Sequence, residues 1–283
     1  MMTPAELEIA EYGHRVLQDL GLICAIGAIL ASILYAWLRS AAPSLQWYRS
    51  GRVPTYHVQA IDILGCLLVI LPFTLSLMTP FQDTSGATLS TFAVIVNFAI
   101  LLAMAGIVLA LYQQRGVLED VLGIRPENTA HTVTWAIVTY IIFFVILIAL
   151  GFSGMEDWLS ERLGEKQNQD VVNELLNADN PNKRLVLILG ACVIAPVAEE
   201  IIFRGYLYPV LKRFTEPFIA AILTGILFGA IHGQIWAVIP LSIFGILLAL
   251  LYEKSGSIWS CILCHALFNS INVFFMLTMG DQI

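Results

Sequence analysis

The chain has 283 residues, of which 58% are apolar and only 12% are charged, and its formal net charge is −7. A soluble domain carries about twice that share of charged residues, so the composition excludes an ordinary soluble protein and indicates an integral membrane protein. No basic tract suggests a nucleic-acid partner. The five cysteines all fall inside apolar segments, where free cysteine behaves as a small hydrophobe, and this argues against a disulfide framework.

Apolar segments of membrane-spanning length recur along the whole chain. Because a spanning helix needs roughly 17–25 mostly apolar residues, the sequence predicts an all-α, polytopic membrane bundle of about eight transmembrane helices. We expect them near residues 19–39, 60–79, 89–112, 132–153, 185–208, 218–232, 236–252 and 257–278. The first four, with an acidic extramembrane loop at 154–184, form an N-terminal part (1–184), and the last four form a C-terminal part (185–283). The first apolar run follows an acidic stretch, unlike the short positive start of a secretory signal, so we interpret it as a retained span.

Basic residues of the short connections fall on one side of this predicted bundle. They are Arg39, Arg49, Arg52, Arg115, Arg125, Lys212, Arg213 and Lys254. Cytoplasmic loops are enriched in Lys and Arg, so this side is predicted to be cytoplasmic and both termini extracytoplasmic. Lys183 and Arg184 lie on the opposite side, against this trend.

Two glutamates and an arginine lie inside the predicted fifth span. A charged side chain in a bilayer costs at least ~2.5–3.5 kcal/mol, so such a cluster is a functional hypothesis by default. Glu200 and Arg204 are four residues apart and share a helix face, which favours an ion pair. Glu199 is rotated by about 100° from Glu200 and is left free to accept a proton. The alternative is a purely structural ion pair, with Glu199 reaching toward the cytoplasmic edge.

Further polar side chains lie in the sixth and eighth predicted spans. Phe228 and His232 close the sixth span, while His265 and Asn269 stand four residues apart in the eighth and point the same way. Each of these groups could instead hydrogen-bond to a neighbouring helix and hold the bundle together.

Counting along the helices places these groups at comparable depths. At 1.5 Å per residue, Glu199 and Glu200 lie about 20 Å from the predicted cytoplasmic edge, His232 about 22 Å and His265 about 12 Å. We therefore expect them to meet in one layer near the middle of the membrane.

Small residues follow one stripe of the sixth predicted span. Glycine stands at positions 225, 229 and 233, every fourth residue. Such a stripe lets a neighbouring helix approach closely, and we expect it to help place His232 against the fifth span.

Three short motifs follow one another along these helices: Glu-Glu-x-x-x-Arg, Phe-x-x-x-His and His-x-x-x-Asn. In residues, order and spacing the set resembles the CPBP (Abi) family, which includes CAAX prenyl endoproteases and bacteriocin-processing or self-immunity proteins. The resemblance covers about residues 185–275. One departure concerns the helix between the second and third motifs. Family members often carry Phe or Tyr three residues before its glycine, where this chain has Ser242 before Gly245.

The resemblance implies a role for each motif residue. Glu199 would be the general base, and His232 would help to hold and polarise the attacking water. His265 and Asn269 would bind the oxyanion of the tetrahedral intermediate. The remaining motif residues would support the site or orient the substrate; they are Glu200, Arg204 and Phe228.

The same residue types raise the question of a cofactor. Zinc hydrolases use two histidines and a carboxylate, but the familiar His-Glu-x-x-His spacing is absent, and a water activated by Glu and His needs no metal. We expect no metal and no other cofactor, with zinc as the alternative. Cys261 to His265 also matches the c-type haem attachment pattern, which we reject because it lies inside a predicted span.

The resemblance implies an intramembrane endopeptidase of the glutamate type. Its substrate would be a membrane-associated or lipidated protein, including the prenylated CAAX type, and membrane lipid would be its surroundings. The expected location is multi-pass in a bacterial or archaeal plasma membrane. The alternative is a non-catalytic scaffold or an immunity or regulatory protein of the same fold. A transporter is disfavoured because no inverted repeat is visible.

Overall fold

The computed structural model describes residues 51–78, 91–123, 129–155, 175–176, 180–232 and 235–279. Regular structure in these ranges is helical without strands, which confirms the predicted helical membrane bundle. The predicted first span at 19–39 and most of the acidic loop lie outside them. The helices are α2 (Ile61–Met78), α3 (Thr91–Gln114), α4 (Leu118–Leu122), α5 (Thr129–Phe152), α8 (Pro181–Leu189), η2 (Gly190–Ile194), α9 (Ala195–Glu200), η3 (Ile201–Leu207), α10 (Tyr208–Phe214), α11 (Pro217–Ala230), α12 (Ile235–Ser255) and α13 (Ile258–Met279), where η marks a π-helix.

Each of the other seven predicted spans corresponds to a helix, and six of them agree with it within about three residues at both ends. The bounds predicted for the fifth span were wrong, because α8 to α10 run without a break over Pro181–Phe214, 34 residues. This helix starts early since the Asn180 side chain accepts a hydrogen bond from Asn182 N and Pro181 occupies the first turn. The short helix α4 was not predicted.

Five of the described helices are long and apolar enough to cross a membrane: α3, α5, the α8–α10 helix, α12 and α13. Helix α11 is apolar but has only 14 residues. At 1.5 Å per residue it extends about 21 Å, short of a hydrocarbon core of about 30 Å. Helix α11 is therefore too short to span such a core by itself, and the last residue of the predicted sixth span, His232, lies beyond the helix end.

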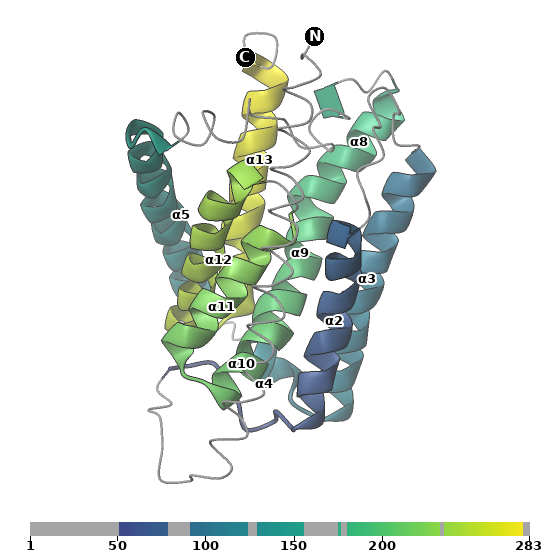
Figure 1. The fold of residues 1–283 in the computed structure, drawn as a ribbon, viewed down its shortest axis with the longest axis vertical. Coiled ribbons are helices and arrows are strands. Elements are labelled where there is room, and N and C mark those ends of the chain that lie inside the picture. The colour runs from purple at the N-terminus through teal and green to yellow at the C-terminus, as the bar shows by residue number, and fades with distance from the viewer. Residues whose placement is uncertain are drawn as a thin grey trace.

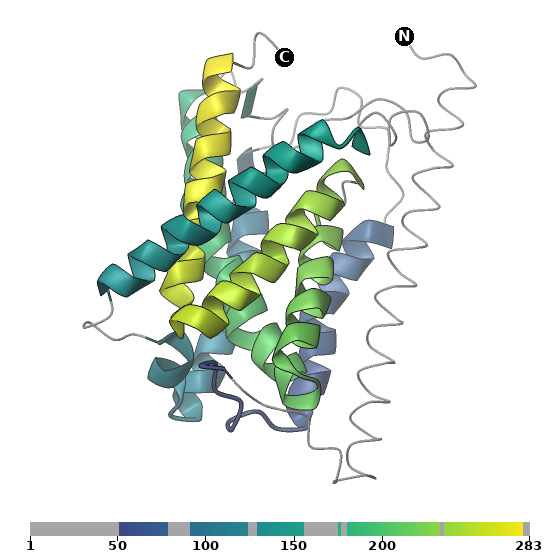
Figure 2. The same ribbon diagram turned by 90° about the vertical axis from the view of Figure 1, so that its left-hand side faces the viewer.

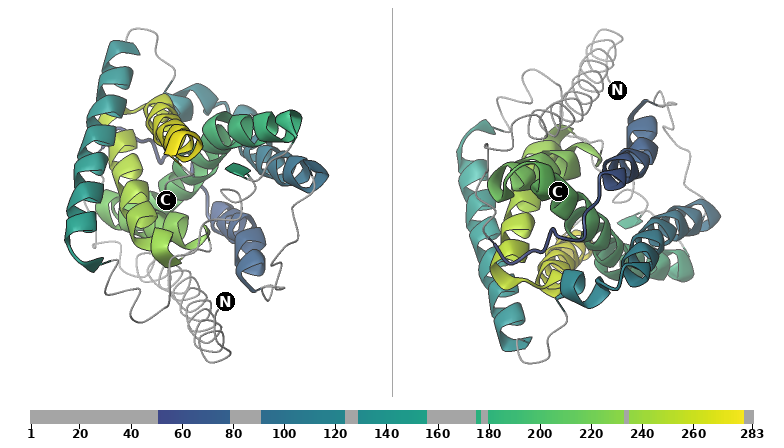
Figure 3. Two further views of the ribbon diagram at one scale, coloured as in Figure 1. Left: turned by 90° about the horizontal axis from the view of Figure 1, so that it is seen from above. Right: turned by 90° about the horizontal axis from the view of Figure 1, so that it is seen from below.

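The long α8–α10 helix lies in the middle of the bundle. Figure 1 shows α2 and α3 on one side of it and α5 on the other, with α11, α12 and α13 between α5 and the central helix, and the end-on views of Figure 3 agree. Helix α5 crosses obliquely over α12 and α13 and packs against both (Figure 2). Residues of the central helix are therefore surrounded by other helices, and many of its side chains from Ile201 to Val210 are buried.

One end of the bundle collects most of the described basic residues, whereas Lys183 and Arg184 lie at the other end, in the first turn of α8. At the first of these ends, helices α2, α5, α11 and α13 begin, and α3, α10 and α12 end (Figure 1). We call it the basic end. The described members of the predicted cationic side all lie in or beside these helix ends: Arg52, Arg115, Lys212, Arg213 and Lys254.

Helices α11 and α12 touch through their backbones at the glycine stripe. A methyl group added at Gly225 would lie 2.7 Å from Ile246 N and 2.8 Å from Ser242 O, and one at Gly229 would lie 2.3 Å from Ser242 Oγ. The helix that approaches this stripe is thus α12, and the expectation that the stripe packs His232 against the fifth span was wrong. The contact also explains the departure at Ser242, because a Phe or Tyr there has no room against Gly229.

Candidate active site

The buried ion pair between Glu200 and Arg204 is the centre of the polar cluster. Glu200 Oε1 lies 2.8 Å from Arg204 Nη1, and both side chains are fully buried. Arg204 Nη2 also donates to Gly245 O at 3.0 Å, and its guanidinium lies over the Phe228 ring at 4.7 Å. The ion pair predicted from the spacing is confirmed, and Arg204 additionally ties the central helix to α12 and α11.

His265 joins this pair from α13. Its Nδ1 lies 2.8 Å from Glu200 Oε1, so the ring donates to the carboxylate that Arg204 already holds. Its other nitrogen, Nε2, lies 3.9 Å from Glu199 Oε2. A carboxylate that binds one ring nitrogen fixes the orientation of the imidazole and leaves the second nitrogen for chemistry. The sequence predicted that the glutamates and histidines meet in one layer of the bundle. The hydrogen bond between Glu200 and His265 confirms this for these two residues.

The two glutamates differ as the helix geometry predicted. Glu199 is partly exposed, with a side-chain exposure of 15%, whereas Glu200 has none. Arg204 pairs with Glu200, and the Glu199 carboxylate instead faces His265 Nε2. Glu199 is thus the less constrained of the two carboxylates.

Aromatic rings connect the two histidines. The Phe228 ring centroid lies 4.9 Å from that of His232 and 5.6 Å from that of His265. The Phe244 ring adds an edge contact to His265 at 5.6 Å. His232 Nδ1 lies 2.7 Å from Phe228 O, so its Nε2 is the nitrogen left unoccupied. Among the described residues no hydrogen bond joins His232 to Glu199, and the expected pairing of these two on one water stays a prediction.

Asn269 lies one turn beyond His265 and bonds to the central helix. Its Nδ2 donates to Ala191 O at 2.7 Å, inside the π-helix η2. In this segment the N–H of Ala195 bonds to Gly190 O, five residues back. The next residue is Pro196, which has no N–H to offer Ala191 O. The Asn269 amide supplies the missing donor, and its second amide hydrogen is free for another acceptor.

The second π-helix, η3, repeats this arrangement at the other side of α9. Pro209 follows η3 and has no N–H to donate to a carbonyl of the preceding turn, which contains Gly205. The Tyr112 hydroxyl from α3 donates to Gly205 O at 2.8 Å. The six residues Ala195–Glu200 therefore lie between two π-helices. Each π-helix has a carbonyl that accepts a hydrogen bond from a side chain of another helix: Ala191 O from Asn269 and Gly205 O from Tyr112. Single π-helical turns within α-helices are frequent at functional sites.

Several of these supporting groups were not found from the sequence. Tyr112, Phe244 and the Gly245 carbonyl lie on helices whose pairing with the central helix no motif indicates. Pro196 and Pro209 were a usable signal, because a proline within a spanning helix leaves carbonyls that need other donors.

A metal site does not emerge from this geometry. The described residues contain no group of three or more His, Cys, Asp or Glu side chains placed to hold a metal ion. One carboxylate of the cluster is already bonded to Arg204 and His265, which suits an ion-paired site better than a metal centre. The absence of a metal remains a prediction.

The polar cluster lies in a segment that is similar to proteins described as membrane peptidases. Residues 181–271 match the family model described as type II CAAX prenyl endopeptidase Rce1-like. The chain is 25% identical over 154 residues to a Bacillus subtilis (strain 168) protein named "Putative membrane peptidase YdiL", an alignment that spans 54% of this chain and 60% of that protein's length. No solved structure matches the chain. The matched segment contains all three motifs, so residues 181–271 of this chain are similar to the type II CAAX prenyl endopeptidases that the family model describes.

Proposed function

We propose that this protein is an intramembrane endopeptidase that hydrolyses a peptide bond of a membrane-associated protein. One observation carries the proposal: Glu200 is committed to Arg204 and His265, while Glu199 remains partly exposed and faces His265 Nε2 at 3.9 Å. A proton acceptor and a fixed imidazole beside one another form the core of a water-activating site.

In this proposal Glu199 is the general base. It takes the proton from a water as the oxygen of that water attacks the scissile carbonyl carbon, and it returns the proton to the leaving amine. His232, which holds its Nδ1 against Phe228 O, offers Nε2 to the same water. General acid–base catalysis of this kind contributes typically 10²–10⁴-fold in rate.

His265 and Asn269 serve the oxyanion. With Nδ1 donating to the Glu200 carboxylate, protonated His265 presents a second N–H from Nε2. The amide hydrogen of Asn269 that Ala191 O leaves unused is a further donor on the same helix. Donors held in place before the reaction can each stabilise the transition state by about 3–4 kcal/mol.

The proposed substrate class is a lipidated peptide, including a prenylated CAAX sequence. The Rce1-like match supports it, as does the depth of the cluster. His265 lies seven residues into α13, about 10 Å from the basic end at 1.5 Å per residue. A lipid-anchored peptide reaches this depth more readily than a soluble one.

The test is cleavage of a quenched, prenylated CAAX peptide by the full chain in liposomes. Glu199→Gln should lower turnover at least a hundredfold, consistent with loss of a general base, while the melting temperature stays within a degree or two. Glu216→Gln, a carboxylate at the start of α11 whose side chain makes no capping bond, is the matched control. Retained activity in Glu199→Gln overturns the assignment.

A second arm covers substrates other than prenylated peptides. N-terminal proteomics of cells with wild-type protein and with Glu199→Gln should show new protein N-termini only with the wild type. If both cells give the same N-termini and the same phenotype, the protein is a scaffold rather than a peptidase.

A further inference from the structure

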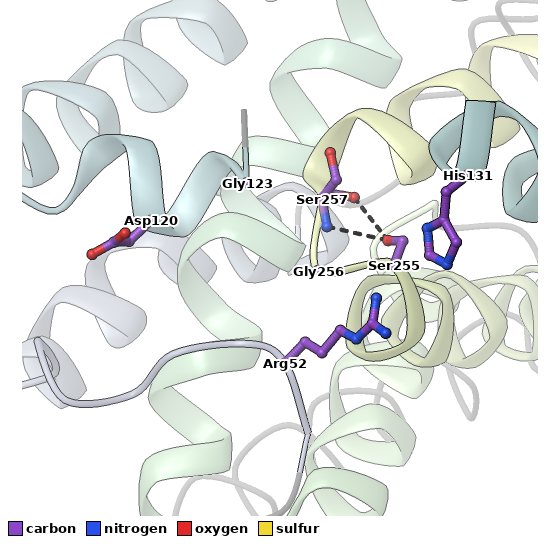
Figure 4. A pocket seen from close by; sticks show the side chains of 7 residues that line it. All are labelled: Arg52, Asp120, Gly123, His131, Ser255, Gly256 and Ser257. Atoms are coloured by element: carbon purple, nitrogen blue, oxygen red, sulfur yellow. Dashed lines mark hydrogen bonds between the residues drawn. The ribbon is translucent and has the colours of Figure 1, made fainter. Parts of the chain in front are cut away.

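A polar cavity of about 490 Å³ lies at the basic end, away from the glutamate–histidine cluster. It is bordered by the segment before α2, the end of α4, the start of α5 and the α12–α13 turn (Figure 4). It shares no residue with the cluster, and the proposed peptidase chemistry does not use it. Its lining residues are Arg52, Asp120, Gly123, His131, Ser255, Gly256 and Ser257.

Close approach of two backbones shapes this cavity. Gly123 and Gly256 both have positive φ, at 60° and 69°, a conformation that favours glycine. A methyl group at Gly123 would lie 1.9 Å from Gly256 O. The α4 end and the α12–α13 turn are therefore packed tightly, and Ser255 Oγ, bonded to both N and O of Ser257, fixes the turn.

Arg52 brings a positive charge to the cavity without a carboxylate partner among the described residues. Its stem packs on Gly256. The nearest acid on α12, Glu253, is held by Lys212, Tyr208 and Val53 N. Asp120 also lines the cavity, but its carboxylate accepts the Tyr56 hydroxyl and points away from Arg52 in Figure 4.

His131 adds a hydrogen-bond donor opposite Arg52. Its Nε2 accepts from Trp135 Nε1 at 2.9 Å, so in the neutral ring Nδ1 carries the proton. Figure 4 shows the His131 ring and the Arg52 guanidinium reaching toward Ser255 from different sides. Helix α13 begins directly after Ser257, and its N-terminus adds a partial positive charge to the same space. The cavity is therefore arranged for an anion.

The surroundings point to an anion that belongs to the membrane. Lys254 lies 4.9 Å over the Trp135 ring, beside His131, and aromatic and basic side chains gather at the level of lipid headgroups. Further along α5, on the helix face that carries His131, apolar side chains are exposed: Ile142 46% and Val145 58%. An acyl chain that extends from the cavity along this face meets an apolar surface.

We propose that this cavity binds the phosphodiester headgroup of an anionic membrane lipid. The Arg52 guanidinium donates to the phosphate oxygens, a geometry that suits its two parallel N–H groups, and His131 Nδ1–H donates from the other side. The volume lies within the range of about 300–1,000 Å³ typical of ligand sites. Bound lipid ties the segment before α2 to α5 and to the α12–α13 turn.

The test measures binding of tail-labelled phosphatidylglycerol to the full chain purified in detergent, with labelled phosphatidylcholine as the neutral comparison. Phosphatidylglycerol should bind more tightly than phosphatidylcholine, and Arg52→Gln should weaken it about tenfold, as expected for loss of a charge-assisted hydrogen bond. His131→Phe should weaken it to a smaller extent. Arg213→Gln removes a cation from the same end but outside the cavity and should leave binding unchanged.

Three results would overturn the proposal. Equal binding by wild type and Arg52→Gln, both with wild-type melting temperatures, would show that the cavity is not the site. Equal weakening by Arg52→Gln and Arg213→Gln would mean diffuse attraction to a basic surface. Displacement of the labelled lipid by millimolar inorganic phosphate would identify a free anion, and not a lipid, as the ligand.

Discussion

Glu200 is the residue at which the central helix and α13 are joined by charge. One of its oxygens receives both Arg204 Nη1 and His265 Nδ1 at 2.8 Å, in surroundings without solvent. Removing one partner of a buried pair leaves the other charge uncompensated, which costs about 3–5 kcal/mol. The Glu199 carboxylate is partly exposed, so we expect its replacement to change stability much less.

The first prediction separates the two neighbouring glutamates by their effect on stability. Glu200→Gln should lower the melting temperature by several degrees, because Arg204 stays buried without its counter-charge. Glu199→Gln should melt like the wild type. Measurement by thermal unfolding in one detergent gives both values directly. Glu200→Leu combined with Arg204→Met should regain part of the stability, since apolar replacement of a whole buried pair is often neutral. Equal melting temperatures for the two single Gln variants would contradict this division.

Residue spacing foretold part of this site and missed the rest for a physical reason. The Glu200–Arg204 pair follows from two residues on one helix, where geometry is fixed at four residues of separation. The bond from His265 to Glu200 depends on how α13 rotates against the central helix, and no local pattern contains that rotation. The family resemblance named these residues without giving their contacts, and it assigned His265 to the oxyanion without indicating its hydrogen bond to Glu200.

At the scale of elements, two π-helices flank the short helix α9 that carries Glu199 and Glu200. Each precedes a proline, and each has a carbonyl bonded by a side chain from another helix: Ala191 O by Asn269 and Gly205 O by Tyr112. An unsatisfied buried carbonyl costs about 1–3 kcal/mol. Asn269 therefore has a structural task in addition to its proposed place in the oxyanion site.

The second prediction tests that task with a double-mutant cycle. Asn269→Ala alone should destabilise the protein, because Ala191 O loses its donor. Pro196→Ala restores a backbone N–H that can bond Ala191 O, so Asn269→Ala in that background should cost clearly less. The interaction energy from four melting curves measures the coupling. Additive effects would mean that Asn269 and Pro196 act independently and that the Ala191 carbonyl does not link them.

The third prediction concerns the backbone contact of α11 with α12. Gly225→Ala places a methyl group 2.7 Å from Ile246 N and 2.8 Å from Ser242 O, both backbone atoms that cannot move aside. The helices must separate, so we expect a lower melting temperature and, if the proposed function holds, slower cleavage of the CAAX peptide. Gly106→Ala on α3 is the matched control, since nothing lies within 4 Å of its added methyl group. It should be neutral or slightly stabilising, as alanine favours helix by about 1 kcal/mol.

For the whole molecule, the sequence predicted the number of apolar helices in the described part better than it predicted the bounds of the central helix and the partner of the glycine stripe. Apolar runs located seven helices in the described part, because spanning segments must satisfy their backbone groups internally. The bounds failed for the central helix, whose start depends on the Asn180 cap, whereas those of α11 were predicted within about three residues. The glycine stripe was found, but its partner helix was not, because small residues indicate close packing without naming the neighbour.

The last prediction is the orientation of the bundle. Described basic residues of the short connections collect at one end, which by the positive-inside rule faces the cytoplasm. Cysteine replacements at two exposed sites report on it: Glu119→Cys in α4 at the basic end and Ser153→Cys just beyond α5 at the opposite end. In intact bacterial cells a membrane-impermeant maleimide should label Ser153→Cys, and Glu119→Cys should react only after permeabilisation. The unmodified chain gives the labelling baseline: of the described cysteines Cys66, Cys261 and Cys264 are buried and Cys192 is half-buried, so its reaction must be subtracted. Labelling in the reverse order would contradict the predicted orientation and would mean that the basic end is extracytoplasmic. His265 lies nearer the start of α13 than its end, so the site would then be closer to the extracytoplasmic surface.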